Sequence, residues 1–145
     1  KGQKGVLSVE KKLFVETNNG TNRQIRPVTP EQPLRIGDKV IVRLTIRTDR
    51  EMNYVFLKDL RAGCFEPADQ LSGPESRDGI WYYRSPKDVS ENFFINRLPE
   101  GAFVLEYPVY VSRSGEYAGG ISTIQCMYAP EFVSHTAGES LRIMP

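Results

Sequence analysis

The strongest constraint on the fold is a strict alternation of apolar and polar side chains near the middle of the chain. Residues 39–47 read KVIVRLTIR, which places Val40, Val42, Leu44 and Ile46 on one side of an extended strand. The other side carries arginine and threonine. A period of two with one apolar side is typical of an antiparallel sheet that buries one face and exposes the other to water. The chain is therefore predicted to contain at least one half-buried sheet.

Similar patterns recur along the whole chain. The other segments interpreted as strands are 5–16, 23–27, 54–60, 80–84, 92–98, 102–113, 121–128 and 140–144. Turn residues separate them, most clearly Asn18 to Gly20, where Asn and Gly tolerate the positive φ of a tight hairpin. No segment has a convincing helical period. Seven to nine short strands with turns between them predict an antiparallel β-sandwich.

Proline and glycine predict three departures from regular strands. Pro108 has no amide proton, so the strand over 102–113 is expected at a sheet edge or with a bulge. The segment 27–33, with three prolines, is interpreted as an extended crossover. The stretch 63–79 is expected to be irregular, and loops of that length are often functional or mobile.

Size and charge limit the classes of protein to consider. A chain of 145 residues fits one domain, residues 1–145, and can bury about 70% of its unfolded surface. The net charge of +1 argues against a dedicated nucleic-acid-binding domain. No apolar run is long enough for a direct membrane span. The start at Lys1 to Lys4 resembles no signal peptide, and we expect a piece excised from a larger protein.

Residues that could carry catalysis or hold a metal are few. His135 is the one histidine, and a loop histidine without a catalytic partner is the favoured interpretation. Neither a zinc-ligand spacing nor a glycine-rich phosphate loop is present. The acidic side chains that could supply calcium ligands lack EF-hand spacing; they are Asp49, Glu51, Asp59, Glu66 and Asp69. We therefore expect no enzyme activity, no metal and no cofactor.

Two cysteines allow a disulfide. In an exported sandwich Cys64 and Cys126 would commonly pair, and closing a loop of about 60 residues would stabilise the fold by roughly 4 kcal/mol. The alternative is two buried thiols that never meet, because the sequence does not give their separation.

A cluster of aromatic residues supports an alternative function. Trp81, Tyr82 and Tyr83 could stack on sugar rings, as in a carbohydrate-binding or adhesion module of a cell-envelope protein. Alternation, however, sends Trp81 and Tyr83 to one face and Tyr82 to the other, so one side of this strand is expected in the core.

Three blocks of sequence, in order, resemble the end of bacterial alpha-2-macroglobulin-like proteins. Residues 49–67 read DREMNYVFLKDLRAGCFEP, residues 93–101 run from Phe-Phe to Leu-Pro-Glu-Gly, and residues 127–131 read MYAPE. The resemblance covers about residues 34–143 and is greatest to the Bacteroides-type members, which carry these cysteines. It implies the C-terminal macroglobulin-like, immunoglobulin-like β-sandwich of a large exported protein that resides in the periplasm or cell envelope.

The resemblance also implies a role. Such proteins are endopeptidase inhibitors: a protease cuts a bait segment, the protein changes conformation, and the protease is entrapped. The partners implied are neighbouring domains of the same chain and, through the full-length protein, target proteases. Many members carry a Cys–Gln thioester elsewhere in the polypeptide. Cys64-Phe65-Glu66-Pro67 is a near miss for the Cys-x-Glu-Gln motif, but Pro67 replaces the acylating glutamine, so this chain cannot form that bond.

The residues at the MYAPE block are the candidate contact site. In the resembling proteins this loop is thought to shield the thioester from water. Methionine adapts to irregular surfaces and tyrosine joins an apolar ring to a polar tip, which suits a contact with a neighbouring domain. We predict an inter-domain contact made by Met127, Tyr128, Pro130 and Glu131; packing of Met127 and Tyr128 in the core or at its rim is the alternative.

Overall fold

The structure, a computed structural model, is all-β in the residues that it describes, which are 5–20, 22–68, 72–77 and 79–145. The fourteen strands are β1 (Leu7–Asn19), β2 (Asn22–Pro27), β3 (Leu34–Arg35), β4 (Lys39–Thr48), β5 (Met52–Leu60), β6 (Phe65–Pro67), β7 (Gly73–Arg77), β8 (Ile80–Pro86), β9 (Ser90–Leu98), β10 (Gly101–Val111), β11 (Gly115–Ala118), β12 (Ser122–Cys126), β13 (Ala129–His135) and β14 (Ser140–Met144). The β-sandwich prediction is confirmed.

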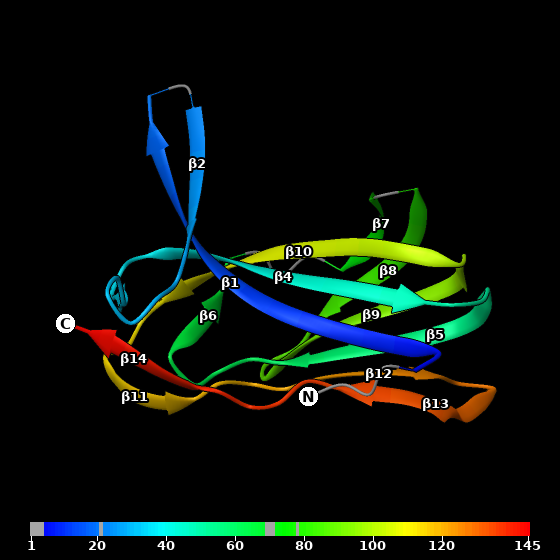
Figure 1. The fold of residues 1–145 in the computed structure, drawn as a ribbon. Coiled ribbons are helices and arrows are strands. Elements are labelled where there is room, and N and C mark those ends of the chain that lie inside the picture. Colours follow the sequence, from blue (N-terminus) through cyan, green and yellow to red (C-terminus); the bar gives the residue numbers. More distant parts are fainter. Residues whose placement is uncertain (1–4, 21, 69–71, 78) are drawn as a thin grey trace.

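The strands form two large sheets and one small one (Figure 1). The five-stranded sheet has the order β2-β1-β4-β10-β6, and the six-stranded sheet has the order β13-β12-β5-β9-β8-β7. A three-stranded sheet, β11-β14-β3, lies at one end, and its β14–β3 pair is parallel. All other strand pairs are antiparallel.

The core lies between the two large sheets and is built by the alternation seen in the sequence. Val40, Val42, Leu44 and Ile46 of β4 are all 1% exposed or less. They face fully buried side chains of the other sheet, among them Leu57, Phe93 and Ile124. One hydrophobic cluster runs from Leu7 to Ile143. The antiparallel β1–β2 hairpin, with Gly20 at φ 71°, confirms the predicted turn.

Five strands were not anticipated from the sequence: β3, β6, β7, β11 and β13. Two of them, β6 and β7, lie within the stretch 63–79, so that stretch is not the irregular loop expected. Four of these strands have only two to five residues, and such short strands form because a neighbouring strand edge is available. Their own sequences carry little alternation.

Pro108 predicts an edge position or a bulge for its strand. Strand β10 instead lies between β4 and β6, and its register with β4 runs unbroken from Gly101 to Tyr110. Its other neighbour, β6, pairs with it only from Val109 to Val111. The Pro108 carbonyl accepts a hydrogen bond from the Ala68 amide on the β6 side, so the missing N–H of Pro108 faces that side too. The proline thus removes no bond from the long β4–β10 ladder. Within the described residues, no helix is long and apolar enough to cross a membrane.

Candidate inter-domain contact site

The predicted contact residues lie together at the turn between β12 and β13. Met127 and Tyr128 form the turn and are 53% and 80% exposed. Pro130 and Glu131 are exposed at the start of β13. The structure therefore brings the four residues into one exposed projection, which we call the tip, and Met127 and Tyr128 do not lie in the core.

The tip is anchored to strand β5 by Tyr54, which the sequence did not single out. Among the described residues other than glycine, only Tyr54 has a positive φ, 61°. Its carbonyl accepts a hydrogen bond from the Met127 amide at 2.8 Å, and its ring meets the Tyr128 ring edge to face at 4.9 Å. A left-handed backbone costs a residue with a Cβ about 1–2 kcal/mol. The surrounding contacts must offset that cost, which fixes the base of the tip.

The two cysteines do not form the expected disulfide, because the fold holds them at opposite ends of β5. Both are free and buried. Cys126 pairs with Val55, whereas Cys64 follows Leu60 at the other end of the strand. The strand from Val55 to Leu60 alone spans about 17 Å, while the Cα atoms of a disulfide lie roughly 4.4–6.8 Å apart.

Each cysteine has a local structural contact instead. The Cys126 thiol donates a hydrogen bond to the Asn53 carbonyl at 3.4 Å, a second link between the base of the tip and β5. Cys64 is fully buried, and burial raises the pKa of its thiol, which disfavours the nucleophilic thiolate. With Phe65 to Pro67 forming β6, the near miss for a thioester motif is part of a strand in the five-stranded sheet.

The acidic residues considered as calcium ligands are dispersed. Asp49 pairs with Arg50 and Glu51 with Arg97, both at the surface, and Glu66 is exposed in β6. Asp69 lies outside the described residues. His135 is exposed in β13, with Nδ1 near the Thr136 carbonyl at 3.4 Å. No group of three or more metal-ligating side chains is present in the described ranges.

Asp59, the remaining member of that set, belongs to β5 itself and is fully buried between the two large sheets. Its carboxylate accepts hydrogen bonds from the Lys11 ammonium at 2.7 Å, the Ser122 hydroxyl at 2.7 Å and the Tyr107 hydroxyl. These partners come from β1, β12 and β10, so one carboxylate joins four strands and both large sheets. Burial and the Asp59 charge raise the pKa of Tyr107 well above its usual value.

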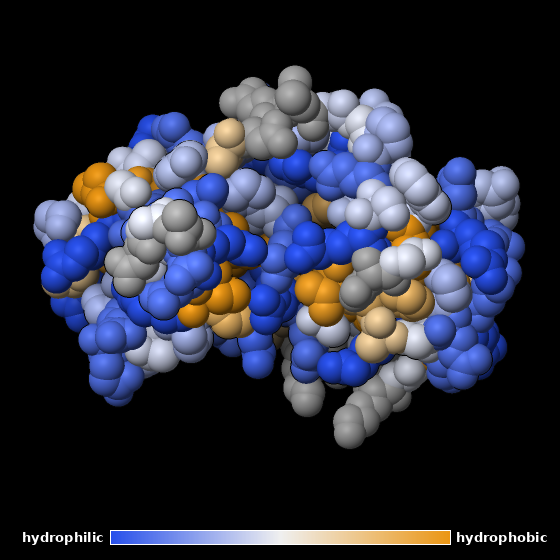
Figure 2. Space-filling model, turned by 90° about the horizontal axis from the view of Figure 1, so that it is seen from above, coloured by the Kyte–Doolittle hydropathy of each residue, from blue (hydrophilic) through white to orange (hydrophobic). Residues whose placement is uncertain are grey.

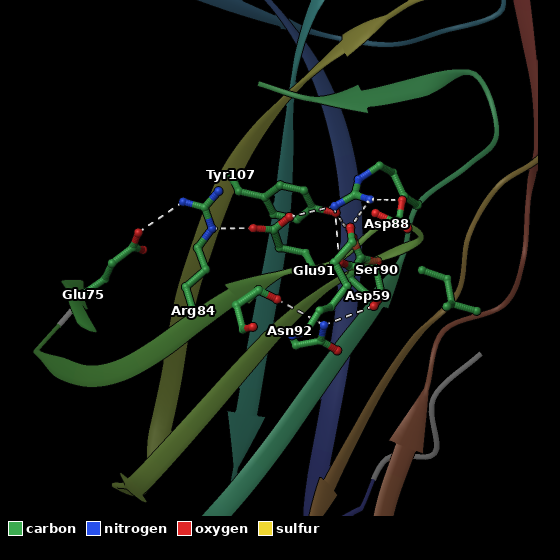
Figure 3. Close-up of polar contacts among 12 residues, drawn as sticks. Asp59, Glu75, Arg84, Asp88, Ser90, Glu91, Asn92 and Tyr107 are labelled. Atoms are coloured by element: carbon green, nitrogen blue, oxygen red, sulfur yellow. Dashed lines mark hydrogen bonds and ion pairs between the residues drawn. The ribbon is translucent and has the colours of Figure 1, made fainter. Parts of the chain in front are cut away.

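A second buried carboxylate, Glu91, lies next to this group (Figure 3). Arg84 donates to it through Nε and also reaches Glu75 at 3.1 Å, while Arg61 donates through Nη2 at 3.1 Å. Arg61 further binds the carbonyls of Lys87 and Asp88 in the β8–β9 turn. Burial raises the pKa of the Glu91 carboxyl despite both arginines. A buried ion network of this kind favours one arrangement of strands over others.

Alternation in the sequence could have revealed this network. Asp59 shares an inward parity with Val55 and Leu57, and Glu91 shares one with Phe93 and Ile95. A charge at an inward position predicts a buried partner of opposite charge. The parity rule did place the aromatic cluster correctly: Tyr82 is 5% exposed, whereas Trp81 and Tyr83 are 71% and 47% exposed.

Comparisons with known proteins agree with this arrangement. The bacterial alpha-2-macroglobulin MG10 domain family matches residues 7–131. Among solved structures, Salmonella alpha-2-macroglobulin reacted with methylamine superimposes with a TM-score of 0.75 at 21% identity, over 100% of this chain and 10% of that chain. Trypsin-activated alpha-2-macroglobulin from Escherichia coli gives a TM-score of 0.74 at 17% identity, over 99% of this chain and 11% of that chain.

Two further relatives show how much longer the matching proteins are. Native Escherichia coli alpha-2-macroglobulin from domain MG7 to the C-terminus has a TM-score of 0.74 at 16% identity, over 99% of this chain and 24% of that one. Circularly permutated Ras protein 2 of Dictyostelium discoideum is 28% identical over 109 residues, which is 75% of this chain but 3% of that protein. This chain therefore spans a small part of its relatives.

The two-sheet topology and the structural likenesses define a β-sandwich of the macroglobulin class. The match over residues 7–131 is specific enough to assign the family: the chain belongs to the bacterial alpha-2-macroglobulin MG10 domain family. The resemblance drawn from the sequence is thereby confirmed.

Proposed function

We propose that this chain is a non-catalytic domain of an exported alpha-2-macroglobulin-like protease inhibitor and that its tip contacts a neighbouring domain of the same polypeptide. One observation carries the proposal: Met127 and Tyr128 are exposed, yet the turn that holds them is anchored by a strained residue. Strain in a folded chain tends to be retained where a fixed geometry serves a function. The family assignment supplies the setting, a long protein in which this chain is one part.

In this proposal the tip covers a reactive site on the neighbouring domain. A thioester is destroyed by water and amines, so a cover must be apolar and must also be able to move away. Tyr128 offers an aromatic ring with a hydroxyl at its edge, and Met127 offers a flexible apolar side chain. Pro130 and Glu131 would lie at the rim of the contact. The protein would reside in the periplasm or cell envelope, where its protease targets are encountered.

The test uses the full-length polypeptide with Met127→Ala and Tyr128→Ala. We expect faster reaction of its thioester with methylamine and an altered conformational change on protease cleavage. Tyr110→Ala is the matched control, because Tyr110 is also an exposed tyrosine, 44% exposed, but lies on the other large sheet. Unchanged amine reactivity together with an unchanged cleavage-induced rearrangement would refute the proposed contact.

A carbohydrate-binding module is the second candidate, favoured by Trp81. Its indole is 71% exposed and borders a shallow groove of about 430 Å³ that also contains Tyr83, Asn96 and Arg97. Aromatic faces beside amide and guanidinium groups can hold a sugar. A glycan array with the 145-residue chain, and with Trp81→Ala as control, separates the two functions, since only a sugar-binding module would give Trp81-dependent signals.

A further inference from the structure

The outward face of the six-stranded sheet is almost free of charge. Register places the outward side chains of its four central strands in rows across the sheet. The members that are not buried are Thr123 and Gln125 of β12; Tyr54, Phe56 and Lys58 of β5; Phe94 and Asn96 of β9; and Trp81 and Tyr83 of β8. Lys58 is the single charged residue of this group, which we call the aromatic face.

The other large sheet provides an internal comparison. Its outward positions on β1, β4 and β10 include Glu10, Lys12, Glu16, Arg43, Arg47 and Glu106. Ion pairs connect several of them, such as Arg43 to Glu106 at 2.6 Å and Arg47 to Glu10 at 4.0 Å. Seen from above, the side on which β4 and β10 lie, the molecule is mostly hydrophilic, with apolar patches between (Figure 2). This is the surface expected of a sheet in contact with water.

The aromatic face has the composition of a buried interface instead. Depletion of charge with enrichment in tyrosine, tryptophan and phenylalanine distinguishes the core of protein interfaces from ordinary surface. Phe56 and Phe94 stack across β5 and β9 with centroids 4.7 Å apart, and Tyr83 is the neighbour of Phe94 on β8. Phe94 and Tyr83 are 45% and 47% exposed. A monomer seldom leaves such a continuous row in water without a use for it.

The aromatic face is continuous with the tip. Tyr54 belongs to this face and contacts Tyr128 of the tip. Further across the face, Trp81, Tyr83, Phe94 and Asn96 line one groove together with Arg97. The proposed contact at Tyr128 therefore borders the aromatic face at Tyr54, and a partner docked on the tip would meet the face there.

From this contrast between the two faces we propose that the aromatic face is a docking surface for a folded protein domain of the same polypeptide with a complementary apolar surface. This rests on the proposed function, because it extends the tip contact from a few residues to a sheet face. A face with aromatic rings on several strands suits a protein surface, since aromatic residues dominate the central contacts of such interfaces. A single extended peptide would leave most of the rings uncovered.

The native thiols make the test direct, because Cys64 and Cys126 are both buried and should react slowly. Asn96→Cys places one exposed thiol in the aromatic face, and Arg47→Cys places one on the charged face. Both are polar, exposed positions, so neither substitution removes a core side chain. The two variants are labelled with a bulky thiol reagent in the full-length polypeptide and in the 145-residue chain.

We expect both thiols to react at similar rates in the 145-residue chain. In the full-length polypeptide the Asn96→Cys thiol should react at least about tenfold more slowly, as expected when only transient opening exposes it, while the Arg47→Cys thiol should be unaffected. Equal rates for Asn96→Cys in both contexts would overturn the proposal. Tyr128→Cys, labelled in parallel, reports on the tip alone, so failure of the face and failure of the tip are distinguished.

The same experiments can also show that something else covers the aromatic face, either a second copy of the chain or a glycan. A dimer of the 145-residue chain in sedimentation, with Asn96→Cys protected in that dimer, would mean that a second copy covers the face and would overturn the proposal. Protection of Asn96→Cys by a glycan would overturn it as well. A monomer whose Asn96→Cys thiol is protected only in the full-length polypeptide supports it.

Discussion

Tyr54 holds a backbone conformation that its own side chain disfavours, and its position explains why. Its carbonyl must face the Met127 amide while its ring meets Tyr128, and both contacts depend on the positive φ. Nothing in the sequence marks this residue, because tyrosine inside a strand pattern predicts ordinary extended backbone. The contacts of Tyr54 with the β12–β13 hairpin accompany its positive φ.

The strain at Tyr54 makes a prediction about glycine. Inside a strand, a protein with glycine is usually less stable than the same protein with alanine, by about 0.5–1 kcal/mol. At position 54 the order should reverse, with Tyr54→Gly about 1 kcal/mol more stable than Tyr54→Ala, because only glycine accepts positive φ freely. Urea unfolding measures the difference. At Lys58, four residues further along β5, the alanine variant should be more stable than the glycine variant, as is usual in a strand. If the alanine variant is the more stable one at position 54 as well, Tyr54 is not strained.

Tyr82 predicts a loss of stability at alkaline pH. Burial, and then the charge and hydrogen bond of Glu75, raise the pKa of Tyr82 to about 12 from an ordinary 10.0. Between these values the folded chain holds a proton that the unfolded chain has lost, so the free energy of unfolding falls as pH rises, by up to about 1.4 kcal/mol per pH unit.

Tyr82→Phe should flatten this dependence. Urea unfolding over the same alkaline range gives the slope for the natural chain and the variant. Part of the slope should remain, because burial also raises the pKa of Tyr107 and of Cys64. An identical slope in the variant would mean that Tyr82 titrates alike in the folded and unfolded chain.

At the scale of elements, the connection from β11 to β12 depends on two glycines packed against backbone. A Cβ built on Gly120 would lie 1.7 Å from the Leu60 carbonyl oxygen, and one on Gly119 would lie 2.4 Å from the Glu139 carbonyl oxygen. This close approach lets the Leu60 amide donate to the Ile121 carbonyl at 2.9 Å, where β12 joins β5. The pair thus sets the position of β12 and, through it, of the tip.

Gly120→Ala is expected to destabilise the chain by more than about 3 kcal/mol, because backbone rather than a flexible side chain must move. Gly73→Ala is the control: no atom lies within 4 Å of its Cβ position, and we expect a change within about 0.5 kcal/mol. Both are read from thermal or urea unfolding. Similar stabilities for the two variants would contradict the tight crossing at Gly120.

The long strands could be predicted from the sequence because each carries its own alternation, as β4 does. The short strands could not, since β6 and β7 have three and five residues and form only against β10 and β8. The tip residues were predicted from a family resemblance, and the structure adds that the β12–β13 turn exposes them. The failed disulfide had a different cause: Cys64 follows β5 and Cys126 lies in β12, and the sequence gives no distance between them until the register of these strands is known.

At the scale of the whole molecule, the two large sheets have different surroundings. Asp59 joins the two sheets from inside, one outer face is covered with ion pairs, and the other is aromatic and borders the tip. A free-standing sandwich has no reason for this asymmetry, whereas a domain docked on one side requires it. The small net charge of +1 fits partners that are neighbouring domains rather than polyanions.

Hydrogen exchange in the full-length polypeptide, measured before and after protease cleavage, tests the central claim most directly. The amides of Tyr128 and Ala129 should exchange more slowly before cleavage than in the 145-residue chain, and should reach the rate of that chain after cleavage. Amides of β4, beneath the charged face, should not change. Equal exchange at Tyr128 and Ala129 in all three states would contradict a tip that is held against a neighbouring domain and released when the protease acts.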